Sequence, residues 1–168
     1  TQTVTGPISG VTAITVLLSN GSDTINVLDA GSVPVAIIGT GTLNINGLIS
    51  TSADVSISGV TDLTGTGTIQ GVAVNLLASN GIGSSGARVK TTATTLVANA
   101  GNGGLFLAET DGADITAIIS GFGNIDILNQ SGELLVSEVS IPSGNLRLES
   151  ADGVTLDADP VSYTHLRA

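Results

Sequence analysis

The chain has 168 residues, enough for one domain of ordinary size, and it is 41% hydrophobic but only 2% aromatic. Its 14 Asp and Glu against 4 Lys and Arg give a net charge of −10, which argues against nucleic acid and anionic membranes as partners. Cys is absent, which excludes disulfides and Cys-based metal or redox sites.

The local pattern of residues favours strands over helices. Short runs of β-branched residues are broken by Gly, Asn, Asp and Ser, which is typical of strands joined by tight turns. Apolar residues rarely keep a helical spacing, and no apolar run is long enough for a membrane helix. We therefore predict an all-β chain without membrane insertion, whose acidic excess serves solubility rather than a specific cationic partner.

The first half of the chain repeats a pair of aliphatic residues at a nearly constant step. The members of this repeat are Ile14 and Val16, Val35 and Ile37, Val55 and Ile57, and Val74 and Leu76. A looser second series steps from Ile25 to Ile45 and from Leu43 to Leu63. The period is close to 20, which indicates one supersecondary unit that is stacked on copies of itself.

The second half repeats with the same period, and each unit contains an apolar strand, a turn with Gly and a second apolar strand. The equivalent positions are Leu105, Ile125 and Leu146; Leu107, Ile127 and Leu148; Gly112, Gly132 and Gly153; and Ile115, Leu135 and Leu156. Asp111, Ser131 and Asp152 come directly before the three Gly residues. Asp111 therefore occupies a repeated turn position.

These steps predict a parallel β-solenoid of about 20 residues per coil and seven or eight coils, covering residues 1–159. Alternate side chains of a strand share a face, so the aliphatic pairs point inward and their polar neighbours point outward. Parallel stacking gives each backbone N–H and C=O a partner in the next coil. Both ends of the sequence are interpreted as cuts through a longer protein.

The register breaks between Val74 and Leu105, which are separated by about one and a half periods instead of one. The excess of about half a coil predicts an irregular coil or a loop insertion at about residues 80–95. This stretch contains Arg88 and Lys90, which are weak candidates for a binding site because insertions on solenoids often carry one. A plain loop is the favoured interpretation.

Residues 70–158 resemble a known family in the order of their motifs. GIGSSGARVKTTATTLVANAGNGGLFL is followed by GNLRL and by DGVTL, with matching positions at residues 81–83, Arg88, residues 93–96, 103–107, 144–148 and 152–156. This order is similar to the repeat region of large secreted bacterial exoproteins of the filamentous haemagglutinin type. The resemblance implies a right-handed β-helix at the bacterial surface or outside the cell. It also implies an outer-membrane secretion partner and adhesion to a receptor or glycan on a host or neighbouring cell.

Residues 160–168 do not follow the repeat and contain the only Tyr and the only His, Tyr163 and His165. This tail resembles the translated read-through of a sequencing adapter, and a genuine loop to the next coil is the alternative. Under either interpretation we expect no chemistry at His165.

Parallel β-helices also include polysaccharide lyases and hydrolases, which is the alternative function. Asp111 and Asp114, or Asp157 and Asp159, are close enough in sequence to suggest a carboxylate pair, but turn positions explain them better. Residues 20–25 resemble a single calcium-binding nonapeptide, which requires tandem copies. We expect no enzyme activity, catalytic residue, metal or cofactor. An enzyme should show clustered carboxylates with Lys or Arg on one outward face, whereas a rod should show mixed Thr, Ser and Asn.

Overall fold

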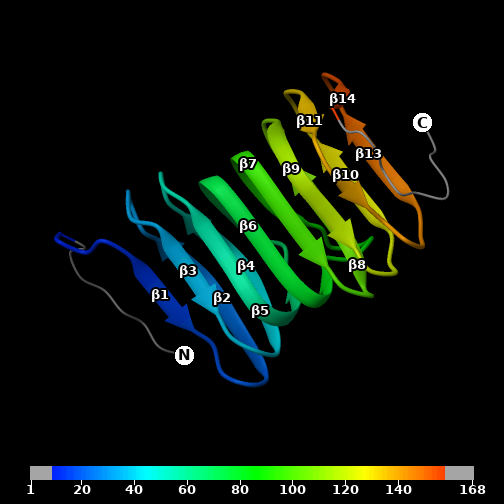
Figure 1. The fold of residues 1–168 in the computed structure, drawn as a ribbon. Helices are drawn as coiled ribbons and strands as arrows, with labels where there is room; N and C mark the ends of the chain where they lie inside the picture. Colours follow the sequence, from blue (N-terminus) through cyan, green and yellow to red (C-terminus); the bar gives the residue numbers. More distant parts are fainter. Residues whose placement is uncertain (1–8, 158–168) are drawn as a thin grey trace.

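A computed structural model describes residues 9–157, and this part of the chain consists of β-strands, turns and bends without a helix. It therefore includes no helix that could cross a bilayer. The strands pair in parallel and wind into a β-solenoid of about seven coils, as the period of the sequence predicts. Figure 1 shows the coils stacked in chain order, from the blue β1 at one end to the orange β14 at the other.

Most strands are short, because each coil turns corners at glycine-rich bends; β6 and β7, with 15 and 12 residues, are the longest. Their bounds are β1 Ile14–Leu17, β2 Ser22–Asp29, β3 Val35–Ile38, β4 Thr42–Ser50, β5 Val55–Thr64, β6 Thr68–Ile82, β7 Val89–Ala100, β8 Gly104–Glu109, β9 Ala113–Ser120, β10 Ile125–Asn129, β11 Leu134–Val136, β12 Val139–Ser140, β13 Leu146–Ser150 and β14 Val154–Leu156.

Two continuous columns of aliphatic side chains fill the interior. The first interior column contains Ile14, Val35, Val55, Val74, Leu96, Ile115, Val136 and Leu156. The second interior column contains Leu43, Leu63, Ile82, Leu105, Ile125 and Leu146. Away from the two end coils, members of both columns are almost completely buried, so the columns together form one core along the stack.

The expected insertion of half a coil is wrong, because Val74 and Leu105 belong to different interior columns. Val74 pairs with Leu96 in the next coil, and Ile82 pairs with Leu105 in the same way. This coil is therefore only slightly longer than the others. Its extra length forms a tight turn between β6 and β7, in which Ser84 and Ala87 exchange backbone hydrogen bonds of 2.9 and 3.1 Å.

The expected equivalence of Leu135 with Ile115 and Leu156 is also wrong by one position. Val136 pairs with both Ile115 and Leu156, whereas Leu135 pairs with Asp114 on the outward face. The run Leu134-Leu135-Val136 is apolar in both strand phases, so the pattern alone does not define which side chains point inward. The structure buries Leu134 and Val136.

Glycine allows the coils to approach each other closely where the ladder between β2 and β4 is irregular. The register shifts there, so that Asn46 and Gly47 of β4 lie opposite Asn26 of β2. A Cβ atom on Gly47 would lie 1.4 Å from the carbonyl oxygen of Asn26. Any side chain at this position would therefore force the two coils apart.

We expect Gly47→Ala to reduce the free energy of unfolding by about 2 kcal/mol or more, because backbone atoms of β2 must move to make room for the methyl group. Gly86→Ala is the matched control, since a Cβ there meets nothing within 4 Å. It should change stability by less than about 0.5 kcal/mol in urea unfolding. Equal losses in both variants would contradict the close approach of the coils.

We expect Leu105→Ala to cost about 2–5 kcal/mol, because it opens a cavity in the middle of the second interior column. Leu77→Ala removes the same atoms from a side chain that is 40% exposed and should cost much less. Urea unfolding of the two variants measures this difference. Similar losses in both would show that Leu105 does not occupy an interior column.

Candidate functional site

The two basic candidates, Arg88 and Lys90, have different surroundings. Arg88 follows the turn between β6 and β7, and its Nη2 atom lies 2.5 Å from Oδ2 of Asp126 in β10. Lys90 lies in β7, is exposed, and forms no ion pair within residues 9–157. Of the two, Lys90 therefore has the charge that remains available to a partner.

Asp126 is the centre of a small charge network on the outward face. Its Oδ1 atom accepts a hydrogen bond of 3.0 Å from Nη1 of Arg147 in β13, and Arg147 also pairs with Glu149. The hydrogen bond and the charge of Asp126 raise the pKa of Arg147 above its ordinary value. Asp126 pairs in register with Phe106 of β8, and Phe106 lies in the coil between those of Arg88 and Asp126. The ion pair of Arg88 with Asp126 therefore reaches across this intermediate coil. The network therefore ties successive coils together.

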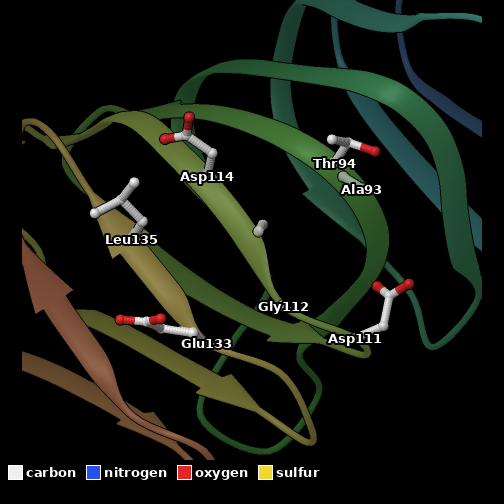
Figure 2. Close-up of a pocket in the computed structure, with 8 residues that line it drawn as sticks. Ala93, Thr94, Asp111, Gly112, Asp114, Glu133 and Leu135 are labelled. Carbon is white, nitrogen blue, oxygen red and sulfur yellow. The ribbon is translucent and has the colours of Figure 1, made fainter.

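A shallow pocket of about 400 Å³ opens on a different face of the stack. Its lining comes from three successive coils and consists of Ala93, Thr94, Asp111, Gly112, Ala113, Asp114, Glu133 and Leu135. Figure 2 shows Asp114 on the strand between those of Thr94 and Leu135, with Asp111 and Glu133 near the turns. The lining thus contains the predicted Asp111 and Asp114 together with Glu133, which the sequence did not indicate.

The three carboxylates of this pocket do not form a recognisable reaction centre. Figure 2 shows Asp111, Asp114 and Glu133 at separate points of the rim instead of converging on one position. The lining includes neither Lys nor Arg, and within residues 9–157 no three acidic or His side chains are placed to hold a metal ion. One oxygen of Asp114, Oδ1, is buried without a hydrogen-bond partner.

The other candidate residues have structural roles or lie outside the described part of the chain. In the calcium-like segment, Asp23 Oδ2 accepts hydrogen bonds from the backbone N–H and the hydroxyl of Ser19, at 3.0 and 3.2 Å. Asp23 therefore closes a turn. Asp157 ends the described residues, and Asp159 and His165 lie outside them.

A buried polar corner is the feature that sequence reasoning missed. One column of the stack, the corner column, changes from aliphatic to polar along the rod. Its members are Leu28, Ile49, Ile69, Thr91, Glu109, Asn129 and Ser150. A signal was present in the sequence, because Glu109 follows Leu105 and Leu107 in the same inward phase. Asn129 and Ser150 follow their aliphatic pairs in the same way.

Glu109 has no exposed surface and is held by hydrogen bonds to both carboxylate oxygens. The hydroxyl of Thr91 donates to Oε2 at 2.5 Å, and the backbone N–H groups of Ala93 and Thr110 donate to Oε1 at 3.2 and 3.1 Å. Burial raises the pKa of Glu109 from its ordinary value of 4.5 to about 6, although these hydrogen bonds oppose the change.

Comparison with protein-family models, with curated proteins and with solved structures finds no match to this chain. The resemblance to exoproteins of the filamentous haemagglutinin type therefore stays a prediction. What the structure itself establishes is a β-solenoid with an acidic pocket, a buried polar corner and an exposed Lys90 that forms no ion pair within residues 9–157.

We expect Asp126→Ala to reduce the free energy of unfolding by about 1–2 kcal/mol, because Arg88 is then left half-buried without its charge partner. Arg147→Ala is the control, since the Arg147 side chain is largely exposed and Arg88 keeps its partner. It should leave the urea midpoint almost unchanged. A larger loss for Arg147→Ala than for Asp126→Ala would contradict the bridging role of Asp126.

Proposed function

We propose that this chain is a stiff spacer segment of a large secreted or surface-exposed bacterial exoprotein that contributes to cell adhesion. The unbroken stack of coils carries this proposal. At about 4.8 Å per coil, the roughly seven coils formed by residues 9–157 extend for about 34 Å as one continuous stack. Such a rod holds whatever follows it at a fixed distance from its anchor.

One outward face supports a spacer better than an enzyme, whereas the face with Asp126 carries the charge network of Arg88, Arg147 and Glu149. The outward column beside the first interior column contains Thr15, Ala36, Ser56, Asn75, Val97 and Ala117. These are small, polar or modest apolar side chains, without the carboxylate and cation pairs that act on a polysaccharide. A face of this composition suits a solvated rod.

A carbohydrate-active enzyme is the second candidate, because three carboxylates line the same open pocket. Glycoside hydrolysis needs two of them at opposite sides of one glycosidic bond, one as acid and one as base or nucleophile. Asp111, Asp114 and Glu133 do not converge on such a position (Figure 2), and neither Phe106 nor Phe122 lines the pocket as a sugar platform. The enzyme therefore remains the weaker proposal.

The proposed location is the bacterial surface or the extracellular space, reached with the help of an outer-membrane secretion partner. The proposed ligand is a receptor or glycan on a host or neighbouring cell. Lys90 is the side chain that supports a direct contact, because it is exposed and its charge is not engaged within the described residues. A ligand with sulfate, carboxylate or phosphate groups fits this side chain best.

Beads coated with the purified chain test both candidates when they are applied to epithelial monolayers and to bacterial lawns. We expect more beads bound than with an albumin coat, and a several-fold reduction with Lys90→Glu but not with the exposed control Gln70→Glu. The same protein should release no reducing ends or unsaturated products from a panel of polysaccharides. Absence of binding to both cell types would contradict adhesion by this segment. Cleavage that is lost on combining Asp111→Asn, Asp114→Asn and Glu133→Gln would establish the enzyme instead.

A further inference from the structure

The corner column places an ionisable group where the fold does not require one. Ile49 and Ile69 fill the same corner in earlier coils, and both are completely buried. Two coils further along, Glu109 occupies the equivalent position with no exposed surface. Burying an ionised carboxylate is costly unless a cation or strong hydrogen bonds compensate for the lost water.

The groups around Glu109 provide hydrogen bonds but no positive charge. In β7, the Thr91 hydroxyl and the Ala93 N–H donate hydrogen bonds to Glu109. Lys90, which lies before Thr91 in the same strand, is exposed on the outward face. From β10 the facing residue is Asn129, whose amide is engaged with Gly112, Gly132 and Ser150. Asp111, in the turn that follows β8, is the titratable group that interacts with Glu109, and this interaction favours the protonated state.

The turn of residues 110–112 joins this corner to the pocket. The Thr110 N–H is bound by Glu109 Oε1, and the Thr110 hydroxyl donates to the Thr91 carbonyl at 3.0 Å. The Gly112 N–H donates to Asn129 Oδ1 at 3.2 Å, and Gly112 has a left-handed φ of 89°. Asp111 and Gly112 themselves line the pocket. A change of charge at Glu109 therefore acts on one side of the pocket rim.

We propose that Glu109 is an acid-responsive lock of the solenoid. Uptake of one proton from solvent by its carboxylate in mild acid removes the buried charge and stabilises the folded solenoid around it. Release of that proton at neutral pH leaves an uncompensated charge in the corner and lowers the stability of the coils around it, including the turn of residues 110–112.

The direction of this response follows from the difference between the folded and unfolded states. The pKa of Glu109 is raised from 4.5 to about 6 on folding, so the folded state holds the proton more tightly than the unfolded chain. The stabilisation is complete below about pH 4.5 and is lost as the pH rises through about 6. Because the two pKa values differ by about 1.5, the folding constant should change by up to about 30-fold over this interval.

Glu109→Gln tests the proposal, because it keeps the shape of the side chain and removes its titration. Glu138→Gln is the matched control, since it removes one negative charge from an exposed position. At pH 8 we expect the folding constant of Glu109→Gln to exceed that of the wild type by up to about 30-fold, and the two should converge near pH 4.5. Glu138→Gln should follow the wild type at every pH.

Hydrogen exchange locates the effect. In the wild type, the protection factors of the Thr110 and Gly112 amides should fall as the pH rises, with a midpoint near 6. In Glu109→Gln they should stay constant. The same pH dependence in Glu109→Gln as in the wild type would overturn the proposal.

A measurement on the unaltered protein keeps the proposal testable if Glu109→Gln does not fold. The carboxyl carbon of Glu109, observed by NMR in the wild type, should titrate with a midpoint near 6 and in step with the Thr110 amide shift. A midpoint at or below 4.5, or an amide that does not follow the carboxyl, would also overturn it.

Discussion

The parallel backbone ladder between successive coils is the constraint on which the rest of this structure depends. Strands as short as these are not stable alone, and each one here is held by hydrogen bonds to neighbouring coils. The ladder also places equivalent side chains above one another, so the aliphatic columns are a consequence of the backbone pairing. Stability then comes from each coil and its neighbours, as expected for a repeat architecture.

The same stacking explains which polar side chains lie next to one another on successive coils. A side chain in a column meets the same kind of position one coil away, which suits pairs such as Asn124 and Asn145, whose amides are hydrogen-bonded across the step. It is unfavourable for repeated like charges, and Asp126 accordingly lies between two arginines. Glu109 has no such partner, and its burial raises its pKa above the ordinary value although neutral donors oppose this.

The coil period and most members of the interior columns could be predicted from the sequence, because inward aliphatic pairs recur with little change in spacing. The register at the junction of the two halves could not be predicted. Val74 and Leu105 each begin an aliphatic pair and so look equivalent in the sequence, although they belong to different interior columns. Leu135 was misplaced because three consecutive apolar residues fit either strand phase. Glu109 was missed because a charged residue in an inward phase contradicts the hydrophobic pattern on which such a prediction depends.

The most direct test of the stacked architecture is a pair of distances measured by pulsed EPR. The chain has no Cys, so spin labels can be attached through Thr15→Cys combined with either Val97→Cys or Ala117→Cys. These outward positions lie four and five coil steps apart in one ladder, so their backbone separations should be about 19 and about 24 Å, which differ by one coil rise. Distances that do not increase by about 5 Å from the first pair to the second would contradict the solenoid.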